Sequence, residues 1–394
     1  MRVGPSQEEI RRQNLGALLR YVHIHGATSR AELTTALGLN RSTIGALTAD
    51  LAGAGLVSEG APRETGRAGR PSPVVRPESE RVFAYAYSIE VDRLRAARVG
   101  LGGAVLDRRE TARPYGVAAA ETAPLLAAFV KEMQQAVPAG STYVGAGVAV
   151  CGLEMREEGP VHVKPETGFV DRSLGAALDA HLAPERPILV GNAADVSALA
   201  EHARGAAVGC DDLIYLHRDV GVDAGIIVRG RRLTGHGGLG GEVGHMVVQP
   251  GGRECGCGSR GCWETVIGEY ALLDGAAGGG GTGRRAALSI VDAAARGDAS
   301  AKAAVREVGD WLGFGVANLV NIFNPGMVIF GGTLRDVYLA SAARVRSRLN
   351  SMALPASREQ VKLRTPQLGE DAALIGAAEL AFEHLLAAPL DATA

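Results

Sequence analysis

The sequence predicts an α/β protein that begins with a winged helix-turn-helix. Three short helical segments and then two short strand segments occupy the first 80 residues. From about residue 82 onward, strand patterns alternate with helical patterns, which is typical of an α/β sheet protein. One histidine and three cysteines lie close together in this second part. We therefore expect a small DNA-binding module followed by a larger α/β body with a metal-binding loop.

The composition suits an ordinary globular chain without a membrane segment. The 394 residues carry a formal net charge of -2, and residues 1–80 hold ten arginines, no lysine and eight acidic residues. The net charge of this segment differs little from that of the rest of the chain, so a nucleic-acid site must be confined to a small part of the surface. No stretch resembles a signal peptide or approaches the ~18 apolar residues that span a bilayer. Three of the five cysteines fall in a metal pattern, which suits a reducing cytoplasm better than a disulfide framework. We therefore expect a cytoplasmic protein, and the lack of a long apolar run predicts no membrane partner.

The first 80 residues read as a DNA-binding domain. Apolar residues recur on one face of residues 7–25, which predicts a first helix. Ser29 and Glu32 form a capping-box pattern that starts a second helix, in which Leu33, Ala36 and Leu37 are expected to face inward. Gly38 supplies a turn before a third helix. Two short helices joined by such a turn form a helix-turn-helix.

The residues expected to contact DNA fall into two groups. The start of the third helix is small and polar with one arginine, as the first turn of a recognition helix needs. A Gly-spaced arginine loop between the two strands resembles a wing that enters a minor groove. The candidates are Ser29, Arg30, Asn40, Arg41, Ser42, Thr43, Arg67 and Arg70. The alternative is a three-helix interaction module with a solvated basic loop.

A metal site is predicted in the second half of the chain. His245, Cys255, Cys257 and Cys262 lie within eighteen residues. Zinc prefers four tetrahedral nitrogen and sulfur ligands, and short spacers let one loop wrap the ion. Four protein ligands leave no position for a catalytic water, so we expect one structural zinc ion per chain. Three ordinary thiols beside a surface histidine are the alternative.

The sequence around this site resembles the signature of the ROK family of sugar kinases and sugar-responsive repressors. Gly-Glu-Val-Gly-His at 241–245 and the cysteine pattern at 255–264 carry the resemblance, which extends from about residue 82 onward. It implies a two-lobed, actin-like ATPase body with a central ligand cleft. It also implies sugar contacts from Asn192, Glu242, His245 and Glu264. Support of the zinc loop is the alternative role for Glu242 and Glu264.

The composition changes around residues 76–78, which places a domain boundary near residue 80. We expect residues 1–80 to form the DNA-binding domain, residues 81–190 and 374–394 the first lobe, and residues 191–373 the second lobe with the zinc loop. The pattern predicts a β-meander over 82–108, and a last helix over 373–386 that returns to the first lobe. Other expected elements are helices at 118–136, 174–182 and 312–323, and strands at 144–150, 188–190 and 327–330.

The kinase machinery of the family is eroded in this sequence. ROK kinases place an Asp base after the Asn that matches Asn192, but this chain has Ala193, whose methyl group cannot accept a proton. Asp195 would point about 200° away from residue 193 on a helix. The two phosphate turns, at 88–92 and 218–223, have lost glycines and gained acids. We therefore predict no catalytic residue and no enzyme activity.

The leading interpretation is a repressor that binds double-stranded operator DNA and senses a sugar or sugar derivative, such as an amino sugar. Lys164 and Arg218 raise the further possibility of a sugar phosphate. Helix-turn-helix proteins usually bind paired half-sites, so a homodimer or homotetramer is expected. One alternative is an ATP-dependent sugar kinase with a fused DNA-binding domain. The other is a regulator controlled by a protein partner instead of a sugar.

Overall fold

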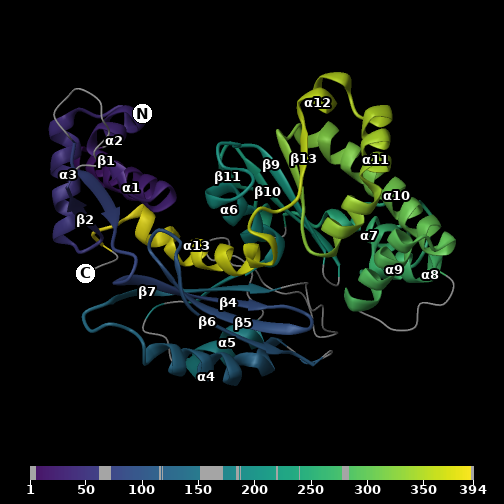
Figure 1. Cartoon of the computed structure of the whole chain (residues 1–394), viewed down its shortest axis with the longest axis horizontal. Helices are drawn as coiled ribbons and strands as arrows, with labels where there is room; N and C mark the ends of the chain where they lie inside the picture. Colours follow the sequence, from purple (N-terminus) through teal and green to yellow (C-terminus); the bar gives the residue numbers. More distant parts are fainter. Residues whose placement is uncertain are drawn as a thin grey trace.

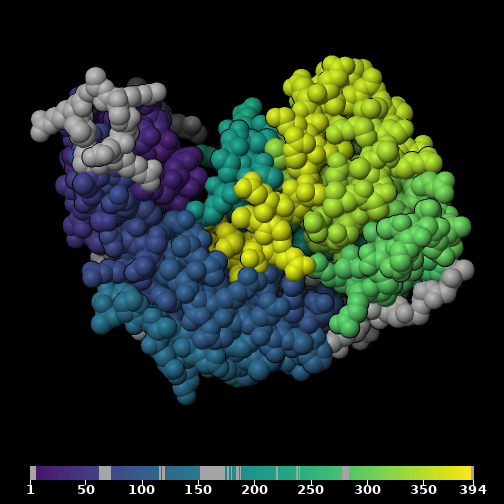
Figure 2. Space-filling view, viewed as in Figure 1, coloured from purple at the N-terminus to yellow at the C-terminus, as the bar shows by residue number. Residues whose placement is uncertain are grey.

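The computed structural model describes residues 6–61, 72–114, 117, 119–150, 172–182, 186, 188–218, 221–238, 240–276 and 284–391. A small amino-terminal domain and the second lobe stand on the first lobe with a notch between them (Figures 1 and 2). Within the described ranges, no helix is long and apolar enough to cross a membrane. The arrangement confirms the predicted fold class.

The amino-terminal domain is a winged helix-turn-helix. It contains α1 (Gln7–His25), α2 (Arg30–Leu37) and α3 (Arg41–Gly53), and a small sheet in the order β1 (Thr28–Ser29), β3 (Val74–Pro77) and β2 (Val57–Gly60). The predicted capping box at Ser29 and Glu32 is present. Leu33 packs into the core as expected, whereas Ala36 is exposed because the short α2 buries only one narrow stripe.

The first lobe is built on a five-stranded sheet in the order β6-β5-β4-β7-β8. Its strands are β4 (Val82–Ile89), β5 (Arg93–Gly100), β6 (Val105–Ala112), β7 (Thr142–Val150) and β8 (Ile188–Asn192). Along β4, Phe83, Tyr85 and Tyr87 pack toward α4 (Ala123–Gln134) and α5 (Arg172–Leu182). The alternating Ala84 and Ala86 face α13 (Ala372–Ala387) on the other side. The sheet is therefore covered on both faces.

The second lobe repeats this topology with the order β11-β10-β9-β12-β13. Its strands are β9 (Leu213–Arg218), β10 (Val222–Val228), β11 (Arg231–Arg232), β12 (Met327–Phe330) and β13 (Lys362–Arg364). In each sheet two antiparallel pairings precede two parallel ones in chain order. The repetition of strand order and direction in both lobes is typical of the actin-like architecture.

Helices cover the two faces of the second sheet unequally. On one side lies α6 (Ala193–Arg204), which follows directly from β8. The other helices of this lobe are α7 (Glu264–Ile267), α8 (Glu269–Gly275), α9 (Arg284–Arg296), α10 (Ala299–Phe323), α11 (Thr333–Met352) and α12 (Pro355–Gln360). The helix predicted at 312–323 is only the second half of α10, because the same buried stripe continues toward the amino terminus through Ala301, Ala304, Val305 and Val308.

The amino-terminal domain shares a core with the body through α13. Leu15, Leu18 and Leu19 of α1 belong to the same apolar cluster as Leu385 and Leu386 of α13. The two helices approach so closely that a Cβ atom added at Gly16 would lie 2.6 Å from the backbone oxygen of Leu386. Together α6 and α13 form the layer between the two sheets, and α13 reaches the amino-terminal domain (Figure 1).

Candidate functional site

The four predicted metal ligands form a compact cluster. The candidate ligand atoms of His245, Cys255, Cys257 and Cys262 all lie within 4.8 Å of one another. The Sγ atoms of Cys257 and Cys262 are 3.7 Å apart, and Cys255 Sγ lies 3.5 Å from His245 Nδ1. Metal–sulfur bonds of ~2.3 Å in a tetrahedron place two sulfurs ~3.8 Å apart. The cluster could therefore hold a metal ion with tetrahedral geometry.

Packing against α10 fixes the loop that carries the cluster. The buried Trp263 follows Cys262 directly, and its Nε1 donates a hydrogen bond of 2.9 Å to the backbone oxygen of Trp311. The indole ring lies on Gly315, where an added Cβ atom would come within 2.0 Å of it. Only glycine permits this contact, so α10 and the loop are fitted to each other.

The residues expected to contact a sugar gather around one pocket and the cluster. Asn192 and Glu242 line the same small pocket. Asn192 ends β8 and caps α6, with its Oδ1 accepting a 2.7 Å bond from the backbone nitrogen of Ala194. His245 lies between two carboxylates: its Nε2 is 3.8 Å from Glu242 and its Nδ1 is 3.6 Å from Glu264. Glu264 also accepts a 2.8 Å bond from the Cys255 thiol. The last contact matches the alternative role of supporting the metal loop.

Three further charged side chains line this pocket and were missed from the sequence: Asp195, Asp223 and Arg232. The Nδ2 atom of Asn192 donates a 3.3 Å hydrogen bond to Asp223. Burial raises the pKa of Asp195 to about 6, although nearby Arg232 opposes the shift. Burial and the neighbouring carboxylates of Asp223 and Glu264 raise the pKa of Glu242 to about 7. The pocket is therefore polar, acidic and partly shielded from solvent.

The expectation that Asp195 points away from the site is wrong. It lines the pocket, with one oxygen 3.5 Å from Arg232 Nη1. The rotation of about 200° along the helix was measured from residue 193. Ala193 is buried in the apolar cluster shared with α13. Asp195 points to the opposite side of α6, and this side faces the pocket.

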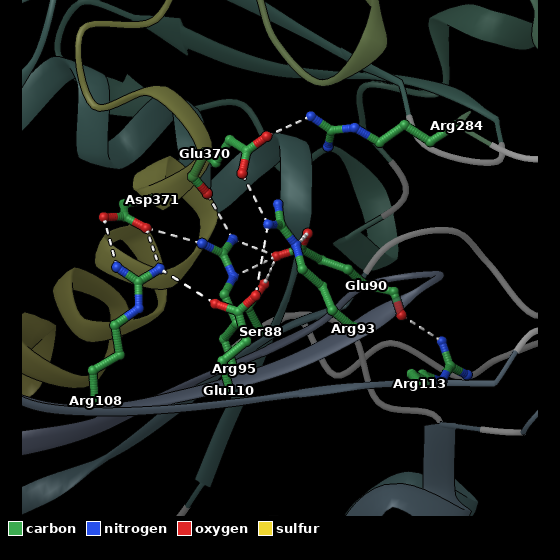
Figure 3. A network of polar contacts seen from close by, with 10 residues as sticks. All are labelled: Ser88, Glu90, Arg93, Arg95, Arg108, Glu110, Arg113, Arg284, Glu370 and Asp371. Carbon is green, nitrogen blue, oxygen red and sulfur yellow. Dashed lines mark hydrogen bonds and ion pairs between the residues drawn. The ribbon is translucent and has the colours of Figure 1, made fainter. Parts of the chain in front are cut away.

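The first phosphate turn contains a buried carboxylate held by arginines (Figure 3). Glu90 follows β4 and accepts hydrogen bonds from Ser88 Oγ at 3.0 Å, Arg95 Nε at 2.8 Å and Arg93 Nε at 2.5 Å. An ionised carboxylate at this position repels phosphate, and the arginines that could bind phosphate already bind Glu90.

The same arginines join the first lobe to the second. Arg95 Nη1 lies 2.9 Å from Asp371, and Arg93 Nη1 lies 2.8 Å from Glu370, both in the short helix η4 (Gly369–Asp371) before α13. Glu370 also accepts a 2.6 Å bond from Arg284 of α9 (Figure 3). An ion network thus spans the lobes where the family has its first phosphate turn. In the second turn, Asp219 and Val220 lie outside the described residues, as does Lys164.

Comparison with known proteins identifies this body. The model of the ROK family matches residues 86–384, which include the cluster and the pocket. The chain belongs to the ROK family. It is 27% identical to the xylose repressor of Bacillus spizizenii over 387 residues, which cover 96% of this chain and 97% of that repressor.

Two solved ROK structures resemble the chain to different extents. A ROK family transcriptional regulator, a homolog of the E. coli MLC protein, matches with a TM-score of 0.74 and 25% identity over 98% of this chain and 99% of its own. A ROK family glucokinase from Streptomyces griseus, in complex with glucose and AMPPNP, matches with a TM-score of 0.60 and 26% identity. That match covers 98% of the glucokinase but 76% of this chain. The similarity to the regulators is therefore the more complete one.

Among the described members of the predicted DNA-contacting set, some are exposed and others are held by contacts within the winged helix. Ser29 caps α2, and Asn40 caps α3 by accepting a 2.8 Å bond from the backbone nitrogen of Thr43. Arg30 is paired with Glu59 of β2 through two hydrogen bonds of 2.5 and 2.6 Å. Asn40, Arg41 and Ser42 are exposed at the start of α3. Arg67 and Arg70 lie outside the described residues.

Replacing Arg41 with alanine is expected to weaken DNA binding by about tenfold, since one arginine contact to a base or phosphate contributes on the order of 1–3 kcal/mol. Fluorescence anisotropy with a labelled genomic site would measure the change. Arg306→Ala, on the exposed face of α10, is the matched control and should bind like the wild type. Unchanged affinity of Arg41→Ala would exclude Arg41 from the DNA interface.

A buried polar cluster joins the winged helix to the ROK body. His23 of α1 is fully buried; its Nδ1 accepts a 2.9 Å bond from the backbone nitrogen of Gly102, and its Nε2 lies 3.0 Å from Glu379 of α13. Arg204, the last residue of α6, lies 2.5 Å from Glu379 and donates to the backbone oxygens of His23 and Gly102 at 3.0 and 2.8 Å. Helices α1, α6 and α13 and the turn between β5 and β6 meet at this cluster.

Acidification is expected to destabilise this junction. Burial lowers the pKa of His23 from 6.5. Below pH 6.5 the unfolded chain therefore binds a proton at His23 that the folded chain does not bind, and the free energy of unfolding decreases. Burial alone would raise the pKa of Glu379, but the hydrogen bond from His23 and the charge of Arg204 lower it to about 2 from 4.5, so its contribution is lost as pH falls below 4.5. Urea unfolding should show a free energy of unfolding that decreases from pH 7.5 to pH 5.

The histidine component of this pH dependence can be isolated by substitution. In His23→Asn the dependence between pH 7.5 and 5 should be smaller, whereas the exposed His384→Asn should retain it. An equal pH dependence in both variants would exclude His23 as its source.

Proposed function

We propose that this ROK protein is a DNA-binding transcriptional repressor whose body senses a sugar and transfers no phosphate. The proposal rests on one chain combining a winged helix with a ROK body that keeps sugar-site residues but lacks the kinase base. A winged helix shares its core with a ROK body that keeps Asn192, Glu242 and the cysteine loop. The same body has Ala193 where the family's kinases have their base. The full-length similarity to the xylose repressor supports the regulatory part.

In this proposal Asn192, Glu242, His245 and Glu264 contact the sugar, since carboxylate and amide groups in a concave site pair well with hydroxyls. One structural zinc ion is bound by His245 and the three cysteines. Its role is to hold the loop that presents Glu242 and His245 to the pocket. A reducing cytoplasm keeps these thiols available for the metal.

The partner of the winged helix would be double-stranded operator DNA. Exposed Arg41 and Ser42 begin the helix that enters the major groove, and Arg67 and Arg70 of the wing would reach the minor groove. A homodimer or homotetramer would place two winged helices on half-sites about one helical turn apart.

In this proposal, helix α6 couples sugar binding in the pocket to DNA binding by the winged helix. Its N-cap is Asn192, in the pocket, and its last residue is Arg204, which contacts His23 of the winged helix. A sugar that favours one arrangement of the lobes would move α6 and α13 together and so change the spacing of the winged helices. Binding of sugar and of DNA would then be thermodynamically linked.

Footprinting of the zinc-loaded protein on the DNA around its own gene tests the proposal. We expect protection of a palindromic site, released by one sugar, and no ADP release in a coupled assay across hexoses with ATP. If no palindrome is protected, the repressor function is wrong. Sugar-dependent ADP release would instead support a kinase with a fused DNA-binding domain. DNA binding that no sugar alters would favour control by a protein partner.

A further inference from the structure

The pocket beside Asn192 is rich in carboxylates. Asp195, Asp223 and Glu242 line it, and Arg232 is the one basic side chain among its described lining residues. Arg232 is already shared between two acids. Its Nη1 lies 3.5 Å from Asp195, and its Nη2 lies 3.0 Å from both carboxylate oxygens of Glu383. Within the described part of the pocket, no arginine or lysine is left to pair with an anionic ligand.

Asp223 occupies a central place in this pocket. Strand β10 holds it opposite His217 of β9, and it receives the 3.3 Å hydrogen bond from Asn192. The other end of the Asn192 amide is fixed by its bond to the backbone of Ala194. Asn192 and Asp223 therefore orient each other. A carboxylate offers about four lone-pair sites, so Asp223 retains capacity for a ligand after bonding to Asn192.

We propose that Asp223 is a specificity residue of this pocket, and that with Glu242 it selects an unphosphorylated amino sugar. This inference rests on the proposed function, because it names the chemical class of the effector. An ammonium group carries three donors and a positive charge, and both suit a pair of carboxylates better than one hydroxyl does. A phosphate group brings negative charge to a site where the described cation is already paired, so a sugar phosphate should be excluded.

Isothermal titration calorimetry of the zinc-loaded full chain tests the inference. The panel contains glucosamine, galactosamine and mannosamine, the parent hexoses, and the 6-phosphates of both sets. One amino sugar should bind about tenfold more tightly than its parent hexose, the difference between a charge-assisted and a neutral hydrogen bond. The 6-phosphates should not bind. This comparison uses the wild-type chain and does not depend on whether a variant folds.

The variant Asp223→Asn keeps the size of the side chain and removes its charge. It should bind the amino sugar about tenfold more weakly, and the parent hexose within about twofold of wild type, so that the selectivity disappears. Asp211→Asn, an exposed aspartate that does not line this pocket, is the matched control and should keep the wild-type selectivity.

The outcomes separate this inference from the function on which it rests. If a neutral hexose binds best, or if Asp223→Asn keeps the amino-sugar preference, the inference is wrong while sugar sensing stands. Binding of a 6-phosphate, lost in Lys164→Ala, would also overturn it. If no member of the panel binds a chain that still binds DNA, the proposed sugar sensing fails as well.

Discussion

The Cys262→Ser variant is expected to lose its metal and to melt about 10 °C below the wild type. Cys262 is buried and precedes Trp263, so the loss of the metal releases the loop that packs on α10. Structural zinc contributes on the order of 10 kcal/mol to folding in small zinc domains. Here the Trp263 contacts retain part of the loop structure, so a loss of several kcal/mol is expected, at about 2–4 °C per kcal/mol.

Metal analysis by atomic emission and a thermal melt would measure both effects. Cys210→Ser is the matched control, because Cys210 is a partly buried free thiol outside the cluster. It should keep one zinc per chain. Full zinc content in Cys262→Ser would show that the predicted ligand set is wrong.

Arg204→Met is expected to destabilise the protein by about 3–5 kcal/mol, because it leaves the buried Glu379 carboxylate without its arginine. The side chains of Arg204 and Glu379 are only 12% and 6% exposed, so water cannot replace the lost partner. Urea unfolding would measure the change. The exposed pair Arg348–Asp310 provides the control: Arg348→Met should cost less than about 1 kcal/mol.

The double variant Arg204→Met/Glu379→Met makes this test sharper. Replacing both members of a buried ion pair with apolar residues is often nearly neutral, so most of the lost stability should return. If the double variant is as unstable as the sum of the two single variants, the two side chains act independently and the junction does not depend on their pairing.

Elements with local signals could be predicted from the sequence. The capping box at Ser29 and Glu32, the alternating apolar residues of β4 and the cysteine spacing each act over a few residues, and the fold class followed from them. The duplicated strand order of the two lobes was not visible locally. Only the two-lobed body was expected, from the family resemblance, because sheet order depends on pairings between distant strands.

The polar contacts of the site could not be predicted in the same way. Arg30 and Glu59 are 29 residues apart, and Arg93 and Glu370 are 277 apart, so neither pair leaves a local pattern. Asp195 was misplaced because its direction depends on which side of α6 faces α13. Asp223 was overlooked because the segment 218–223 was interpreted only as an altered phosphate turn. Tertiary packing decides both pairings and the positions of Asp195 and Asp223.

The most direct test of the central claim is an anisotropy titration of the zinc-loaded full chain against DNA sites selected from its own genome. The titration is repeated with each sugar of the calorimetric panel. A DNA-binding sugar sensor predicts saturable, salt-dependent binding to one site, weakened at least about tenfold by one sugar class. Binding that no sugar changes, or the absence of a preferred site, would contradict the account.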